Sequence, residues 1–368
     1  MFAGLAFDTP DKLVSGIFRC SGFLIHLRSI MASMNQKSSI VQTPKSVRGA
    51  LTSDKTVSRA LSDAPDISAK TKETVRKVAD DIGYVPNRAG VRLRTGKTHV
   101  ISLILSTHHD VLSLTSRLIS SIAEGLRNSP YHLVVTHSFP DDDPMKAVRY
   151  IVQNGTADAI ILNQTLPEDP RVKYLIDKGF PFATHGRTIW SENHAYFDYD
   201  NFEFGKVGIA ALAQKGRRHV LLLAPPMHQN YAIEILNGVK EEVVKQGIAL
   251  TVADGVDSDS HRKSIRSYVA EKVGNDPSID CLMSASPNGT MAAIAGLEDA
   301  GLNIGDGFDV FSKETVPILE LFRPGILSAG EDVTKAGQFL AQASVHAAEH
   351  KDQPPMQQMD RPEMMNQD

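Results

Sequence analysis

Side chains that can bind a polyanion are concentrated in one short stretch, "SDKTVSR", which runs from residue 53 to residue 59. Lysine and arginine can pair with base edges or phosphates, and hydroxyl groups near the start of a helix can hold phosphates. Residues 37–98 hold 13 Lys and Arg against 6 Asp and Glu, a net charge of +7, whereas the whole chain of 368 residues carries −4. A basic segment attached to an acidic body predicts a polyanion partner for that segment alone; a solvated charged surface is the alternative.

Three short helices are expected to position these side chains. Thr43 can cap the first helix, Thr52 or Ser53 can cap the second, and the third begins at Ser68 and ends at Gly83. Apolar residues recur at the spacing of one buried helix face in each of them: Val47, Ala50 and Leu51, then Val57, Ala60 and Leu61, then Val75, Val78, Ala79 and Ile82. The second helix then turns its polar side outward, which predicts a helix-turn-helix whose second helix fits the major groove.

The run "TVSRAL", followed by "SDAPDISAKTKETVRKVADDIGYVPNRAGVRLRTGKT", resembles the DNA-binding headpiece and hinge of the lactose-repressor (LacI/GalR) family over more than 40 contiguous residues. The resemblance implies a double-stranded DNA operator as partner, and a homodimer, because one headpiece covers only a half-site. It places the base-reading positions at Asp54, Lys55 and Arg59. It places the phosphate-contacting positions at Ser53, Thr56, Ser58, Ser68 and Asn87.

The turn before the second helix departs from the family pattern. In "GALTSDK" the turn is one residue short and holds no glycine, and Gly49 falls inside the first helix instead, where it costs about 1 kcal/mol relative to alanine. Whether the shortened turn still binds DNA as the family does is therefore left open by the sequence.

The basic run "NRAGVRLRTGKT" follows the third helix and contains no acid. By resemblance, residues 87–98 form the hinge helix, which in this family orders on operator DNA, and Arg88 is a DNA-contacting position. Leu93 stands at the family's leucine, which wedges between base pairs in the minor groove and bends the duplex. The alternative for Leu93 is a packing residue at a domain junction. Gly90 replaces the usual alanine and predicts a poorer helix in the free protein.

From residue 99 onward, short apolar strands alternate with amphipathic helices, which predicts parallel sheets covered by helices on both faces. The expected strands are 99–105, 132–137, 158–162, 180–186, 218–224, 280–285 and 308–312. The expected helices are 112–128, 143–155, 169–179, 201–216, 231–247 and 289–301. Some 260 residues are too many for one ordinary sheet, so two doubly wound halves fit better.

The segment "FDYDNFEFGKVGIAALAQKGRRHVLLLA" resembles the family's crossing between two halves of a periplasmic-binding-protein-like core. The fold class expected is therefore α/β: a three-helix helix-turn-helix headpiece (37–86) and hinge (87–98), then this core. We expect subdomain 1 to comprise residues 99–197 and 327–351, and subdomain 2 to comprise residues 198–326 and 352–361. Residues 362–368 would form a tail, and residues 1–36 are expected to be a non-native or disordered extension, with Met31 or Met34 as the true start.

Ligands of doubly wound sheets bind beyond the carboxyl ends of the strands, so polar residues just after each strand are candidates for binding a small effector. By this reasoning and by the resemblance they are Ser106, His108, His185, Arg187, Asn230, Tyr231, Ser286, Lys313 and Asp332. Their hydrogen bonds suit a sugar or sugar derivative. A solvated loop residue is the alternative at each position.

Three positions depart from the family pattern of effector contacts. Ile235 stands where the family has an arginine, and Ser286 is followed by Pro287 where it has Asn-Asp. Lys313 replaces an acid, so a phosphorylated or acidic sugar is expected to be tolerated, unless Lys313 pairs with Glu314 or Asp332.

Other functions have little support. The chain has neither a dinucleotide-binding GxGxxG, nor a phosphate-binding GK[ST] loop, nor a GxSxG nucleophile elbow, and we expect no enzyme, no catalytic residue and no cofactor. No metal site is expected, because the adjacent side chains of His108 and His109 diverge. Two cysteines fit a reducing cytoplasm, and no run is apolar enough to predict a membrane span.

The sequence thus predicts a cytoplasmic, ligand-responsive, sequence-specific transcriptional regulator, most simply a repressor of genes for carbohydrate uptake or catabolism. The alternative is a sugar-binding protein of the periplasmic-binding-protein type without working DNA binding.

Overall fold

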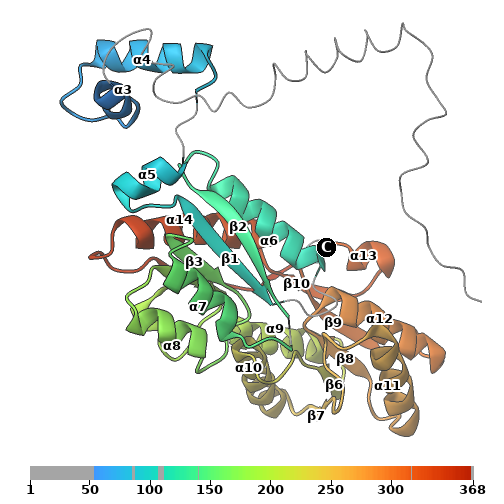
Figure 1. Cartoon of the computed structure of the whole chain (residues 1–368). Helices are drawn as coiled ribbons and strands as arrows, with labels where there is room; N and C mark the ends of the chain where they lie inside the picture. The colour runs from blue at the N-terminus through green and yellow to red at the C-terminus, as the bar shows by residue number, and fades with distance from the viewer. Residues whose placement is uncertain (1–53, 85–87, 107–111, 140, 316, 366–368) are drawn as a thin grey trace, which may run out of the picture. The chain divides into compact units, whose positions relative to one another are not determined.

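The computed structural model describes residues 54–84, 88–106, 112–139, 141–315 and 317–365 of the chain (Figure 1). It divides into two compact units, one up to Arg94 and one from Thr95 onward. The expected first helix, residues 44–51, and the extension, residues 1–36, lie outside the described residues.

The first unit contains the two remaining headpiece helices, α3 (Asp54–Leu61) and α4 (Ala69–Asp81). Val57, Ala60 and Val75 form its buried centre, as their spacing predicted. The Ser68 hydroxyl accepts a hydrogen bond from the Thr71 backbone N–H at 3.2 Å and caps α4. These two predicted helices are confirmed.

The expected hinge segment contains a helix, α5 (Arg88–Thr95). Leu93 on this helix is 90% exposed. Whether Leu93 wedges between base pairs or packs at the domain junction therefore stays a prediction.

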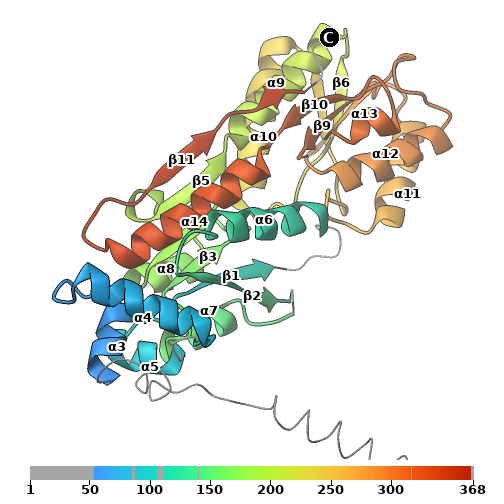
Figure 2. The ribbon, with the colours of Figure 1, turned by 90° about the horizontal axis from the view of Figure 1, so that it is seen from above.

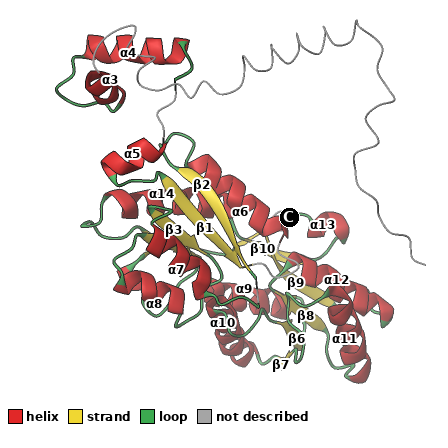
Figure 3. Ribbon diagram, viewed as in Figure 1, coloured by secondary structure: helices red, strands yellow, loops and turns green. Residues whose placement is uncertain are grey.

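The second unit is built on two six-stranded sheets with helices on both faces (Figure 3). The first sheet has the order β11-β5-β4-β3-β1-β2, all parallel. Its strands are β1 (Val100–Ser106), β2 (His132–Ser138), β3 (Ala159–Leu162), β4 (Phe182–His185), β5 (Ala195–Tyr199) and β11 (Gln357–Asp360). Its helices are α6 (Leu112–Gly125), α7 (Met145–Asn154), α8 (Pro170–Asp177) and α14 (Val333–Glu349), with a 3-10 turn at Ser191–Asn193. We call this half the first lobe.

The second sheet has the order β12-β10-β9-β8-β6-β7, in which β12 alone runs antiparallel to its neighbour. Its strands are β6 (His219–Leu223), β7 (Ala249–Val252), β8 (Cys281–Ser284), β9 (Asp309–Glu314), β10 (Leu327–Gly330) and β12 (Glu363–Met364). Its helices are α9 (Asn201–Gln214), α10 (Asn230–Gln246), α11 (Arg262–Asn275), α12 (Pro287–Asp299) and α13 (Leu319–Phe322). We call this half the second lobe. The predicted architecture of two doubly wound halves is confirmed.

The division of the C-terminal part differs from the prediction in two places. Strand β10 belongs to the second sheet, although residues 327–351 were assigned to subdomain 1. Strand β11 pairs in parallel with β5 in the first sheet, although residues 352–361 were assigned to subdomain 2. The chain therefore crosses between the sheets after β10 and again after β11. The sequence did not locate these crossings, because a strand of four residues carries little local signal for the sheet that it joins.

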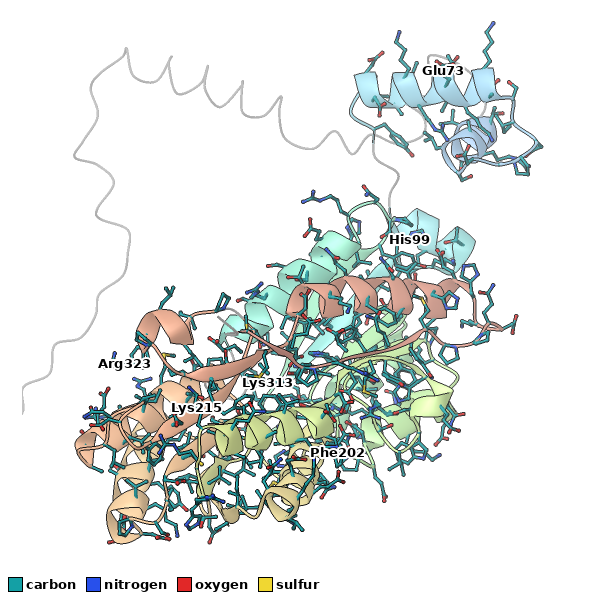
Figure 4. The ribbon with its side chains drawn as sticks, turned by 180° about the vertical axis from the view of Figure 1, so that it is seen from behind. Glu73, His99, Phe202, Lys215, Lys313 and Arg323 are labelled. Atoms are coloured by element: carbon teal, nitrogen blue, oxygen red, sulfur yellow. The ribbon has the colours of Figure 1, made fainter. Side chains whose placement is uncertain are left out.

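Helix packing in both lobes depends on small residues. Helices α6 and α14 lie side by side (Figure 2), and a Cβ on Gly125 would lie 2.7 Å from the Ala341 side chain. On the second lobe α9 packs on α10, where a Cβ on Gly238 would lie 2.0 Å from the Phe202 carbonyl oxygen. Phe202 is labelled at the start of α9 in Figure 4. No side chain fits at Gly238 without moving the two backbones apart.

We predict that Gly238→Ala lowers the free energy of unfolding by roughly 3 kcal/mol, because the added methyl group overpacks the α9–α10 contact. Gly274→Ala is the control: this glycine lies in α11, and a Cβ added to it would meet nothing within 4 Å, so alanine should stabilise by about 0.5–1 kcal/mol. Urea denaturation of both variants measures the two values. Equal effects would contradict the close packing at Gly238.

Candidate functional site

A cavity of about 140 Å³ lies between the two lobes of the second unit. The first lobe lines it with residues at or just after the ends of β3, β4 and β5. The second lobe lines it with residues at or just after the ends of β8, β9 and β10 and with the start of α10. The carboxyl ends of the strands of both sheets thus face one space, which is where doubly wound folds bind their ligands. Its lining residues are Asn163, Gln164, Thr165, His185, Gly186, Arg187, Asp198, Tyr199, Asn201, Asn230, Tyr231, Asp259, Ala285, Ser286, Pro287, Asn288, Lys313, Thr315 and Glu331.

A buried carboxylate, Glu331, joins the two lobes in this cavity. One of its oxygens lies 2.5 Å from the Lys313 ammonium, and the other lies 3.3 Å from Nε2 of His185. Burial alone would raise the pKa of Glu331, but the Lys313 charge and the His185 contact outweigh it and hold the pKa at about 2. Glu331 is therefore ionised at neutral pH and neutralises Lys313.

Lys313 is enclosed by further partners in the cavity, from both lobes. Its ammonium donates a hydrogen bond to the Asn201 side-chain oxygen at 3.2 Å and lies 4.2 Å from the centre of the Tyr199 ring. Figure 4 labels Lys313 in the interior, where the lobes meet. An ammonium held by a carboxylate, an amide and an aromatic face is already satisfied without a ligand.

The structure corrects the expected partner of Lys313. Glu314 points elsewhere and accepts the backbone N–H groups of Ile318 and Leu319, at 3.0 and 2.8 Å. Asp332 caps α14 by accepting the Lys335 N–H at 3.0 Å. The ion pair is thus with Glu331, and it is buried rather than exposed.

Arg187 forms the second charged group of the cavity. Its Nε donates to Asp198 at 2.7 Å within the first lobe, and its Nη2 donates to Glu234 of α10, in the second lobe, at 2.8 Å. Burial raises the pKa of Asp198, and burial together with the Asp198 charge raises the pKa of Glu234 to about 6. One guanidinium thus faces two carboxylates, so this corner of the cavity carries no surplus positive charge.

Among the buried lining atoms that have no hydrogen-bond partner in the described part of the chain, two belong to neutral side chains. They are the hydroxyl oxygen of Tyr199 and the side-chain oxygen of Gln164. Tyr199 is only 1% exposed, so water from the bulk does not reach its side chain freely. A buried polar group without a partner is costly, and a ligand that carries hydroxyl groups would supply partners for both.

Six of the nine predicted effector residues line this cavity: His185, Arg187, Asn230, Tyr231, Ser286 and Lys313. Asp332 does not line it. His108 and the side chain of Ser106 lie outside the described part of the chain. Asn230 begins α10 and donates its backbone N–H to the Thr165 carbonyl of the other lobe at 3.0 Å. Ser286 caps α12 by accepting the Gly289 N–H at 3.3 Å.

Sequence reasoning missed several polar residues of the lining. Asn163, Gln164 and Thr165 directly follow β3, so the rule that identified His185 could have identified them. Asp198 and Asn201 lie next to the first crossover, which was expected at residue 198, and Glu331 lies at the second, which was expected before residue 327. Asp259 and Asn288 also line the cavity and were not singled out.

The headpiece presents part of the predicted DNA-contacting set. Ser58 and Arg59 are exposed on α3, and Thr56 is partly exposed. Asp54 and Lys55 lie in α3 and Arg88 in α5, but their side chains, like Ser53 and Asn87 altogether, lie outside what the structure describes. Arg59 forms an ion pair with Asp66 at 2.5 Å. The Ser68 hydroxyl caps the N-terminus of α4.

None of the described helices combines the length and the apolar composition that a membrane span needs. Among the residues that the structure describes, no three histidine, cysteine, aspartate or glutamate side chains are grouped so that they could hold a metal ion.

A helical headpiece ahead of a two-lobed unit with a central cavity defines a class, the DNA-binding regulators with a periplasmic-binding-protein-like core. Comparisons with known proteins agree. Residues 48–87 match the family model described as "Bacterial regulatory proteins, lacI family". The HTH-type transcriptional regulator AglR of Rhizobium meliloti is 26% identical over 85% of this chain and 89% of its own length. RafR of Escherichia coli is 31% identical over 52% of this chain and 58% of its own length.

Solved structures show the same fold. The lac repressor dimer bound to operator and the anti-inducer ONPF has a TM-score of 0.71 at 18% identity, covering 86% of this chain and 94% of that one. The complex of the regulator CelR with cellobiose has a TM-score of 0.65 at 20% identity, covering 86% and 95%. Residues 48–87 therefore carry the DNA-binding region that the lacI family of bacterial regulatory proteins has, as the headpiece sequence predicted.

We predict that Lys313→Met lowers the free energy of unfolding by roughly 3–5 kcal/mol at pH 7, because it leaves the Glu331 carboxylate buried without its main counter-charge. In the wild type the pKa of Glu331 is lowered from 4.5, so its stabilising contribution is present above about pH 4.5 and is lost as the pH falls toward 2. In the variant burial should dominate and raise this pKa, so stability should increase between pH 7 and pH 5.

Urea denaturation at both pH values measures this inversion. Lys335→Met is the control, since Lys335 pairs with Asp360 at a partly exposed position and its loss should cost less than about 1 kcal/mol. The double variant Lys313→Met/Glu331→Gln should recover much of the loss. A Lys313→Met protein as stable as the wild type at pH 7 would show that the pair is not an essential part of the cavity.

Proposed function

We propose that this protein is a ligand-responsive transcriptional regulator, a repressor of genes for sugar use, that binds operator DNA through α3 and a neutral sugar between its lobes. The observation that carries the ligand assignment is the cavity itself: its two cations are neutralised by protein carboxylates, while hydroxyl-binding groups of the lining have no partner among the described residues. We place it in the cytoplasm, where its DNA is.

The DNA-binding part rests on the headpiece. Its sequence matches the lacI family model over residues 48–87, and α3 holds Ser58 and Arg59 on its open side. A net charge of +7 over residues 37–98 adds attraction for a duplex of any sequence. One such headpiece reads a half-site, so a homodimer is the expected binding form. The match to the family model argues against the alternative of a sugar-binding protein without DNA binding.

The choice of a neutral sugar rests on charge. The cavity is lined by two permanent cations, Arg187 and Lys313, and by three carboxyl groups, Asp198, Asp259 and Glu331, with Glu234 directly behind Arg187. An anionic ligand would have to compete with these carboxylates for cations that they already hold, at close range and with little water. A neutral polyol meets no such penalty. The expectation of a phosphorylated or acidic sugar, which assumed a free Lys313, is therefore replaced.

The names of similar proteins support a carbohydrate ligand without identifying it. CelR, whose complex with cellobiose is solved, shares the fold. A regulator also named CelR, from Thermobifida fusca, is 23% identical over 79% of this chain. We draw from this only the class of ligand.

Specific DNA binding should show a steep dependence on salt concentration, because several phosphates are neutralised by lysine and arginine. Selection on random duplexes provides the binding site. Arg59→Ala should then weaken binding to that site by roughly 1–3 kcal/mol and relax the choice at one base pair. The proposal of a DNA-binding regulator fails if selection yields no preferred site or if binding is insensitive to salt.

Tyr199→Phe tests the effector site without disturbing the fold. The hydroxyl that it removes has no partner among the described residues, so stability without ligand should stay the same or rise slightly. The variant should bind the effector about fivefold more weakly, which corresponds to the loss of one hydrogen bond of about 1 kcal/mol. A thermal-shift screen of neutral sugars, sugar phosphates and sugar acids identifies the ligand, and calorimetry measures its affinity for both proteins. If sugar phosphates stabilise the protein and neutral sugars do not, the charge argument is wrong.

A further inference from the structure

The arginine of the recognition helix has an acidic partner in the loop that follows. The Nη2 atom of Arg59 lies 2.5 Å from a carboxylate oxygen of Asp66. Both side chains are open to solvent, at 55% and 53% exposure. The hydrogen bond from Arg59 lowers the pKa of the Asp66 carboxyl, so Asp66 is ionised at neutral pH.

The loop holds Asp66 in a defined place relative to α3. The Ser62 and Ala64 backbone N–H groups donate to the Ser58 and Arg59 carbonyl oxygens, at 3.1 and 3.0 Å. At its far end, the Ile67 N–H donates to the Ala64 carbonyl at 3.2 Å, directly before the cap of α4. The carboxylate of Asp66 is therefore presented by a loop that is hydrogen-bonded to the last turn of α3.

An exposed ion pair of this kind contributes little to the stability of the fold, since water screens both charges. It does restrict where the guanidinium can lie. Arginine has five N–H donors in a rigid planar fork, and a contact through Nη2 leaves most of them available to a second partner. An arginine that reads guanine needs two of those donors aligned with the O6 and N7 atoms of the base.

We propose that Asp66 is a positioning residue for base reading: it holds the Arg59 guanidinium in the orientation that pairs with a guanine and makes phosphate contacts less favourable. This inference rests on the proposed DNA-binding function. A held side chain loses less conformational freedom on binding the correct base than a free one does. The same carboxylate repels nearby phosphates, so it weakens binding to unrelated duplexes and raises the ratio of specific to non-specific affinity.

The same loop contains a matched control, Asp63. Its carboxylate pairs with Lys72 at 3.1 Å and with Arg76 at 2.8 Å, both on α4, and not with Arg59. Its backbone has a φ of 60°, a conformation that asparagine adopts readily. Asp63→Asn and Asp66→Asn therefore change the net charge of the headpiece by the same amount, a few residues apart.

The experiment compares the full-length wild type with Asp66→Asn and Asp63→Asn on three duplexes: the selected site, a random duplex, and the selected site with the base pair read by Arg59 replaced. That base pair is identified as the one whose replacement lowers the affinity of the wild type but not that of the Arg59→Ala variant. Both asparagine variants should bind the random duplex slightly more tightly, because each adds one unit of positive charge. Discrimination is the ratio of the affinity for the selected site to the affinity for the site with the Arg59 base pair replaced. Only Asp66→Asn should reduce this ratio, by about fivefold or more. Asp66→Asn should also melt at the wild-type temperature.

A double-variant cycle separates positioning from a general effect of charge. Once Arg59→Ala is present, Asp66→Asn should change discrimination no further. The inference is overturned if Asp66→Asn and Asp63→Asn alter discrimination equally, or if Asp66→Asn discriminates as well as the wild type. A wild type that prefers no duplex would instead refute the proposed DNA-binding function, and this inference with it.

Discussion

The carboxylate of Glu331 sets the arrangement around which the ligand cavity is built. Its side chain is almost fully buried, and a charge in that position is tolerated only if other charges and hydrogen bonds meet it. Lys313 comes from β9 of the second lobe and His185 from the end of β4 of the first. Glu331 itself stands where the chain leaves β10 to begin α14. One buried charge thus requires residues of two sheets and of a crossover to meet at one point.

This arrangement decides what the cavity can recognise. A cation that is already paired with a buried carboxylate is a weak anchor for an anionic ligand, whereas amides, hydroxyls and aromatic faces remain available. Contacts between the lobes lie around the same space: Arg187 with Glu234, the Asn230 N–H with the Thr165 carbonyl, and Arg117 with the Thr315 carbonyl at 3.0 Å. A ligand that enters has to fit among these contacts or replace them, so binding and the separation of the lobes are linked.

Much of this could be predicted from the sequence, and what could not has a physical reason. Short apolar runs revealed β1, β3, β6 and β8, because strands buried on both faces consist mostly of apolar residues. Strand β11, with the sequence "QQMD", has no such run, and its partner β5 lies more than 150 residues earlier. Helices α11 and α14 were not singled out either. Their buried residues are separated by polar ones, and the strands before them, β7 and β10, are only four residues long.

The partner of Lys313 is another feature that the local sequence could not predict. Glu314 and Asp332 were the obvious acids from sequence, yet the register of the sheet selects Glu331. Lys313 lies opposite Ala329 in the β9–β10 pair. Side chains alternate along a strand, so Glu331, two residues past Ala329, lies on the same face as Lys313, whereas Glu314 lies on the other face. The register depends on how two strands pair, so it cannot be predicted from the sequence pattern of either strand alone.

The charge distribution of the headpiece and hinge differs from that of the cavity, as expected if one binds DNA and the other a neutral ligand. In the cavity, carboxylates and cations are buried together, so the net field is small and hydrogen-bond geometry decides affinity. The headpiece and hinge, residues 37–98, carry a net charge of +7, which gives long-range attraction to a polyanion but little selectivity among sequences. If Asp66 positions Arg59 as proposed, selectivity there comes from limiting how freely that arginine moves. Asp63, the other aspartate of the loop after α3, pairs with Lys72 and Arg76 of α4 and does not touch the base-reading arginine.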